Sequence, residues 1–146
     1  MSDEKIDFDQ QTIYEWRDLG FHYDQDDNCG SPKWRFHGSK VGLNNFALLL
    51  DEYVSNPNND SISEHQHYGP YNYLKIMTWD KPIITEEYIA GTINDLKSLR
   101  QLFVDKLANA RSGESFDIHK EYGLGNTIGC TFFVTADDFD PASMDK

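Results

Sequence analysis

KWRFHGSKVGLNNFALLLDEYV, residues 33–54, contains the change of hydrophobic period that decides the fold class. Residues 33–37 alternate polar with aromatic side chains, which predicts a half-buried strand with Trp34 and Phe36 facing the core. Ser39 follows and is a suitable N-cap for a helix. After it, apolar side chains recur at intervals of three and four, which predicts a helix of about three turns. The buried stripe of that helix consists of Leu43, Phe46, Ala47, Leu50, Tyr53 and Val54.

The segment before this strand predicts a β-hairpin with an acidic tip. Residues 1–12 are polar, and we expect them to form a flexible terminus. The aromatic residues from 13 to 23 favour an extended segment, and residues 24–32 are rich in turn formers. The tip of the hairpin carries Asp24, Asp26 and Asp27.

Strands and one long helix are expected in the second half of the chain. The expected elements are a strand at 71–79, a helix at 86–110 and strands at 116–122 and 128–135, followed by a flexible acidic tail at 137–146. Thr85 is a suitable cap for the helix, and Glu86 and Glu87 fall in its first turn, where the helix dipole favours anions. The periodicity predicts that Ile89, Ile93, Leu96 and Phe103 are buried together.

The expected order is therefore β-β-α-β-α-β-β in a single domain of residues 1–146. Strands that come largely in hairpins favour an α+β fold, a mixed or mostly antiparallel sheet with both helices packed on one face. A chain of 146 residues that is 38% hydrophobic is long and apolar enough for one core.

The formal net charge of −12 narrows the classes of partner. So much negative charge repels phosphate backbones, so we expect no nucleic acid and, at most, a basic protein as partner. No run reaches the ~18 apolar residues of a membrane span, so no membrane association is expected. The two cysteines, Cys29 and Cys130, occur without a secretory signal, which predicts reduced thiols and a cytoplasmic location.

Glu64, His65 and His67 form the most suggestive metal-ligand pattern. In an extended segment His65 and His67 fall on the same face and could share zinc, with Glu64 as a third ligand. Zinc usually has three or four ligands, and the sequence contains neither His-Glu-x-x-His nor Cys-x-x-Cys. We expect these side chains to be solvated and to bind no structural metal or other cofactor. Zinc is expected only under the alternative interpretation, in which this stretch is a metal site.

Three catalytic or ligand motifs fail on their own geometry. Residues 24–35 begin like a calcium loop but lack its glycine and its final glutamate. The glycines of 123–129 precede a strand, whereas a dinucleotide site needs a helix N-terminus there. Cys130 lies in an apolar strand, and His119 is one of many residues able to approach it. The sequence therefore favours no catalytic residue, although it leaves enzymatic activity open.

The sequence favours a non-catalytic protein-binding module, similar to immunity or inhibitor proteins in composition but in no motif. The expected binding residues are Asp24, Asp26 and Asp27, whose charge can steer a basic partner, together with Trp34 and Arg35. The aromatic contribution depends on Trp34 being exposed, whereas its alternation with polar residues favours burial. The alternative is a small metal-binding protein or hydrolase centred on Glu64, His65 and His67.

Overall fold

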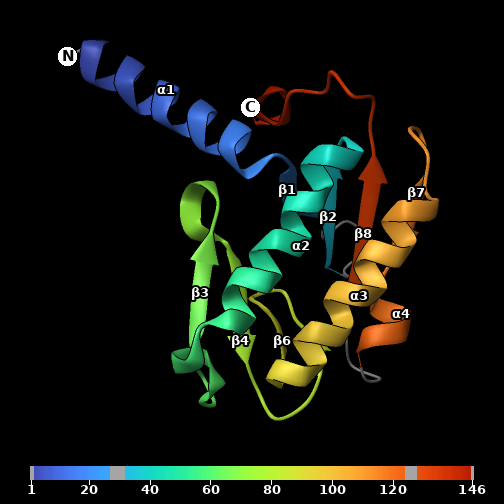
Figure 1. Ribbon diagram of the computed structural model, residues 1–146. Coiled ribbons are helices and arrows are strands. Elements are labelled where there is room, and N and C mark those ends of the chain that lie inside the picture. The colour runs from blue at the N-terminus through green and yellow to red at the C-terminus, as the bar shows by residue number, and fades with distance from the viewer. Residues whose placement is uncertain (1, 27–31, 124–127, 146) are drawn as a thin grey trace.

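The computed structural model of the chain describes residues 2–26, 32–123 and 128–145 (Figure 1). The predicted strand and helix at its centre are both confirmed, as β2 (Lys33–Gly38) and α2 (Lys40–Ser55). Trp34 and Phe36 are buried while Lys33 is exposed, so the alternation assigns the faces of β2 correctly. The Ser39 side chain caps α2 by accepting a 3.0 Å hydrogen bond from the backbone N–H of Gly42.

The strands form two mixed sheets of four strands each, in the orders β1-β2-β8-β7 and β3-β4-β6-β5. In each sheet the central pair, β2 with β8 or β4 with β6, is parallel and the flanking pairs are antiparallel. The remaining strands are β1 (His22–Asp26), β3 (His65–Tyr68), β4 (Leu74–Thr78), β5 (Ile83–Ile84), β6 (Ile89–Gly91), β7 (Ser115–Asp117) and β8 (Gly129–Val134).

Helices α2 and α3 (Ile93–Asn109) lie side by side on the same face of the strands, as predicted (Figure 1). Beneath them an aromatic cluster fills the core. The ring centroids of Phe36 and Phe132 are 4.5 Å apart, and those of Phe46 and Phe103 are 5.0 Å apart. All four side chains are fully buried, which stabilises the fold by roughly 1.5–3 kcal/mol for each of them. The single α+β domain is therefore built on this cluster.

The N-terminal region differs from the prediction. Ser2–Leu19 is helix α1, so the extended segment expected from residue 13 begins only at His22. In its last turns, Trp16 donates to Asp145 and Arg17 donates to Asp140. Both acceptors belong to the C-terminal segment around the 3₁₀-helix η4 (Pro141–Met144). The first turns of α1 point away from the sheets (Figure 1). These contacts anchor the last turns of α1 to the C-terminal segment, whereas the helix itself ends at Gly20, which has a φ of 91° and donates its N–H to the Trp16 carbonyl at 3.0 Å.

The long helix begins later than predicted. Thr85 Oγ1 accepts the backbone N–H groups of Glu87 and Tyr88, as a cap would, but it closes a turn between β5 and β6. The cap of α3 is Thr92, which forms a reciprocal capping box with Asp95. Ile89 therefore lies in a strand. It is nevertheless buried in one cluster with Leu96 and Phe103, against which the partly buried Ile93 packs.

Two further elements correct the predicted order. The expected strand at 116–122 is divided between β7 and the short helix α4 (His119–Tyr122). The chain before β4 forms β3 and the 3₁₀ turn η3 (Pro70–Asn72). The sequence prediction therefore has the right class, but it expected one sheet where the structure has two, and it lacks α1, β3, α4 and the strands β5 and β6.

Candidate functional site

A cleft of about 780 Å³ opens beside β1, the edge strand of the first sheet. Among the described residues, seven segments line it: α1, β1, β2, β3, η3 with the start of β4, the turn between β5 and β6, and the C-terminal segment. Its walls carry the aromatic side chains Trp16, Tyr23, Trp34, Tyr71 and Tyr73. Pockets of this size and aromatic character are typical of binding sites.

Two buried aromatic residues fix the inner wall of the cleft. Trp34 is 1% exposed, and its indole N–H donates a 2.7 Å hydrogen bond to the carbonyl of Thr85. The Tyr23 hydroxyl donates to the carbonyl of Pro70 at 2.5 Å and accepts the backbone N–H of Tyr73 at 3.3 Å. Burial raises the pKa of Tyr23 to about 12, so this hydroxyl stays neutral. The inner wall is consequently apolar and its polar groups are satisfied.

Two exposed tyrosines stand at the mouth of the cleft. Tyr71 is 54% and Tyr73 is 69% exposed, and their ring centroids are 5.8 Å apart. The backbone that carries them is unusual, because Tyr71 (φ 66°) and Asn72 (φ 57°) both adopt the left-handed region. Bulky residues rarely adopt this conformation, and such strain gathers at functional sites.

Negative charge surrounds these rings. Four carboxylates line the cleft, those of Asp24, Glu86, Glu87 and Asp145. Glu86 and Glu87 are exposed on the β5–β6 turn, and the side-chain amide of Gln25 holds that turn by donating to the carbonyl of Glu86. Among the described residues of the lining, Lys75 is the one permanent cation, and it lies over the ring of Tyr88. The cleft thus combines aromatic faces with an excess of carboxylates.

His22 forms part of the wall and has an unsatisfied polar atom. It is 6% exposed and packs on Trp16 with ring centroids 4.4 Å apart. Its Nδ1 has no hydrogen-bond partner among the described residues. Burial lowers the pKa of His22, although Asp24 and Asp145 act in the opposite direction. The imidazole is therefore held neutral near pH 7 and adds no positive charge to the wall.

The structure brings three of the predicted binding residues together in an ion-pair network. Asp24 and Arg35 lie opposite each other on β1 and β2, and the guanidinium donates to both carboxylate oxygens, at 2.8 and 3.0 Å. Asp26 lies 3.9 Å from the same group. The hydrogen bond with Asp24 is the main cause that raises the pKa of Arg35. The charges of Asp24 and Asp26 are thus partly neutralised, in contrast to the free acidic tip that we expected.

The other two predicted binding residues have different outcomes. Trp34 is buried, so it is no exposed aromatic contact, and it forms the inner wall of the cleft instead. Asp27 lies outside the described residues, as does Cys29.

Two of the candidate metal ligands, His65 and His67, lie on strand β3, and the third, Glu64, precedes it. The rings of His65 and His67 are exposed on the same face, as predicted, with centroids 5.2 Å apart. Their Nδ1 atoms bond to the carbonyls of Ser63 and Asn72, at 3.0 and 2.9 Å. The backbone carbonyl of Glu64 accepts the Tyr53 hydroxyl. Within the described ranges no three His, Cys, Asp or Glu side chains are grouped as metal ligands.

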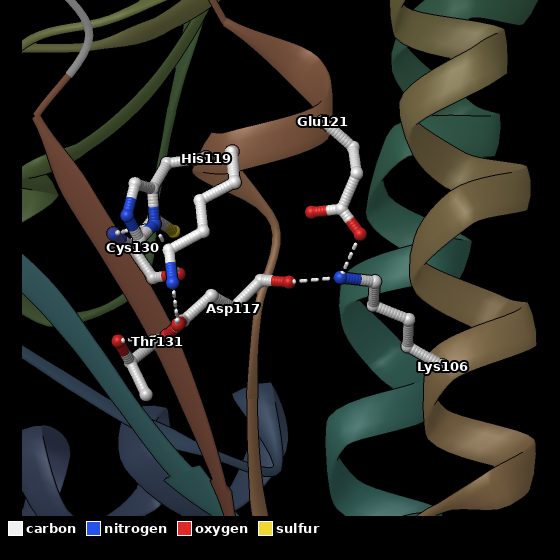
Figure 2. Close-up of polar contacts among 7 residues, drawn as sticks. Lys106, Asp117, His119, Glu121, Cys130 and Thr131 are labelled. Carbon is white, nitrogen blue, oxygen red and sulfur yellow. Dashed lines mark hydrogen bonds and ion pairs between the residues drawn. The ribbon is translucent and has the colours of Figure 1, made fainter.

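A second polar cluster contains His119 and Cys130 (Figure 2). His119 Nδ1 accepts the backbone N–H of Cys130 at 3.1 Å, so the imidazole bonds to the main chain of Cys130. The thiol is fully buried, and burial raises its pKa well above the ordinary value. A buried, protonated thiol is a poor nucleophile. This pair therefore gives no support to nucleophilic catalysis by Cys130.

The rest of this cluster joins α3 to β7 and α4. Lys106 donates to the carbonyl of Asp117 at 2.6 Å and pairs with the carboxylate of Glu121 (Figure 2). Thr131 donates to the Asp117 carboxylate at 2.6 Å. Each polar group faces another protein group, which is typical of structural networks.

Sequence reasoning missed most of the cleft. Its tyrosines were visible in the stretch PYNY at 70–73, but nothing local indicates that Trp16, Glu86 or Asp145 converges on them.

Comparison of the chain with family models, curated proteins and solved structures finds no significant match. None of the helices in the described part of the chain combines the length and apolar character needed to cross a membrane.

Proposed function

We propose that this protein is a non-catalytic binding module whose cleft receives a basic segment of a partner protein. The proposal rests on one observation: aromatic rings and four carboxylates line a single cleft in which Lys75 is the one permanent cation among the described residues. A chain with a net charge of −12 attracts a basic partner over a distance, and the cleft provides the place of contact.

The side chains of the cleft suit a cationic ligand. Ammonium and guanidinium groups are attracted to the faces of tyrosine and tryptophan rings, and carboxylates bond to them by charge-assisted hydrogen bonds. Because His22 is neutral, it adds no positive charge, and the carboxylates keep the electrostatic potential of the cleft negative. Aromatic residues also contribute strongly to binding energy at protein interfaces.

Glu86 and Glu87 carry the recognition in this proposal, and Asp24 does so less. Asp24 already has Arg35 as a partner, whereas Glu86 and Glu87 are exposed beside the cleft. The metal-binding or hydrolase alternative at Glu64, His65 and His67 has weaker support, because in the described part of the chain no three His, Cys, Asp or Glu side chains are grouped as metal ligands. The cytoplasmic location inferred from the sequence stays a prediction.

A peptide-binding measurement tests the proposal. The probe is a fluorescent peptide that alternates glycine with three cationic residues, made in an arginine and a lysine form, and the negative control carries glutamate instead. We expect saturable binding of a cationic form that weakens as salt is added. Absence of saturable binding by both cationic forms would contradict the proposed function.

Matched variants place the binding at the cleft. Glu86→Gln/Glu87→Gln removes two adjacent exposed carboxylates of the cleft, and Asp137→Asn/Asp138→Asn removes two that do not line it. Both double variants change the net charge equally. We expect the first to weaken binding clearly more than the second. Equal weakening would mean that only the total charge matters, which would contradict binding in the cleft.

A further inference from the structure

The turn that carries Tyr71 and Tyr73 is fixed although both rings are exposed. Tyr71 Oη donates to Asp145 at 2.7 Å, and the backbone N–H of Tyr73 donates to Tyr23 Oη. The carbonyl of the residue between them, Asn72, accepts from His67. These bonds hold two consecutive residues in the left-handed region. The fold thus maintains a strained turn that presents two aromatic rings to solvent at the mouth of a cleft.

The arrangement of these rings favours a flat cation. The planes of Tyr71 and Tyr73 are tilted by 31° to each other, with centroids 5.8 Å apart, and we call this neighbouring pair of rings the tyrosine platform. The hydrogen bond from Tyr71 to the Asp145 carboxylate increases electron density on the ring, which strengthens its attraction for a cation. Both tyrosines are more than half exposed, so a ligand can reach the platform.

We infer that the cleft recognises an arginine of the partner, with the guanidinium stacked on Tyr71 and Tyr73 and its N–H groups directed toward the carboxylates of the rim. This inference rests on the proposed function and names the residue type that the cleft selects. A guanidinium is planar, weakly hydrated and carries five donors, so it stacks and bonds to carboxylates at once. An ammonium is compact and strongly hydrated, so it gains less from the same platform.

Arginine, lysine and citrulline forms of the glycine-alternating peptide test the inference. Citrulline keeps the planar shape of arginine without its charge. The arginine form is expected to bind about two- to fivefold more tightly than the lysine form, and the citrulline form more weakly than both. Equal affinity of the arginine and lysine forms would overturn arginine selection while leaving the proposed function intact. Failure of both cationic forms would overturn the two together.

Three single variants assign the preference to the platform. Tyr73→Leu removes one ring and is expected to abolish the arginine preference, while charge-driven binding of both peptides persists. Tyr71→Phe keeps the ring but loses the bond to Asp145, and it is expected to retain part of the preference. Tyr14→Leu changes an exposed tyrosine of α1 that does not line the cleft and serves as the control. An arginine preference that survives Tyr73→Leu in the folded protein would overturn the inference.

Discussion

Tyr71 Oη and Asp145 Oδ2 form a 2.7 Å hydrogen bond although the two residues lie 74 positions apart in the chain. The same carboxylate oxygen accepts the indole N–H of Trp16 at 2.8 Å. One carboxylate thus joins helix α1, the η3 turn and the C-terminal segment at the cleft. Contacts of residues remote in sequence therefore anchor α1 to the C-terminal segment and hold the tyrosine platform.

The Tyr71–Asp145 bond is expected to stabilise the folded protein. Tyr71→Phe should lower the free energy of unfolding by about 1–2 kcal/mol, because a hydrogen bond to a charged acceptor is lost at a partly exposed position. In a double-mutant cycle with Asp145→Ala, urea unfolding should give a favourable coupling between the two residues. Strictly additive effects would mean that the bond contributes nothing.

The start of α3 is tested by its two candidate caps. Thr92→Ala removes the capping box with Asp95 and should lower the free energy of unfolding by about 1 kcal/mol. Thr85→Ala affects only the β5–β6 turn and should leave the helix content unchanged. The measurements are urea unfolding and far-UV circular dichroism of both variants. A larger loss of helix content in Thr85→Ala than in Thr92→Ala would contradict this start and would support the longer helix that periodicity predicts.

The difference between these threonines shows how far local sequence determines the fold. Thr92 has Asp95 three residues later, which is the spacing of a capping box, whereas the corresponding residue after Thr85 is Tyr88. This signal was present in the sequence and distinguishes the true cap. The strand–helix unit of β2 and α2 was predicted correctly because its two hydrophobic periods are local properties. Helix α1 was missed because the aromatic residues from 13 to 23 were interpreted as an extended segment, although Gly20, with a φ of 91°, is a local signal for the end of a helix.

The close contact at Gly91 predicts intolerance of a side chain. A Cβ at this position would collide with Tyr122 Oη and would lie 2.7 Å from Asp95 Cβ. Gly91→Ala should therefore lower the free energy of unfolding by about 1–3 kcal/mol. Tyr122→Phe should restore part of that loss when it is combined with Gly91→Ala, although alone it is destabilising because the hydroxyl bonds to Ala90. Additive losses in the double variant would show that the contact with Tyr122 is not the cause.

The buried His22 and the partly buried His37 predict a loss of stability in mild acid. Burial lowers the pKa of both His22 and His37 below the ordinary value of 6.5. Asp24 opposes this shift for both, Asp145 does so for His22, and Arg35 reinforces it. As the pH falls below 6.5 the unfolded chain takes up protons that the folded histidines do not, so the free energy of unfolding decreases toward the lowered pKa values.

Urea unfolding from roughly pH 5.5 to 7.5 checks this sign, because carboxylates titrate mostly below that range. The slope of the free energy of unfolding against pH should become smaller in His22→Gln and smaller still when His37→Gln is added. Stability that rises on acidification would contradict the assignment.

The candidate site was less predictable than the fold. The sequence singled out Asp24, Asp26 and Arg35, and these three do meet, but chiefly as partners of one another. Their pairing follows from the register of β1 with β2, which no short motif specifies. The described lining of the cleft unites seven segments of the chain, so the cleft emerges only from the tertiary structure.

The most direct test of a cation-binding cleft uses the indole N–H signals of the three tryptophans in a nuclear magnetic resonance titration with the arginine peptide. Trp16 and Trp34 line the cleft and donate to Asp145 and Thr85, whereas Trp79 packs in a separate cluster with Met77 and Ile83. We predict that the signals of Trp16 and Trp34 shift and saturate together while that of Trp79 stays in place. Saturable binding that leaves Trp16 and Trp34 unshifted, or that moves all three signals equally, would contradict binding in the cleft.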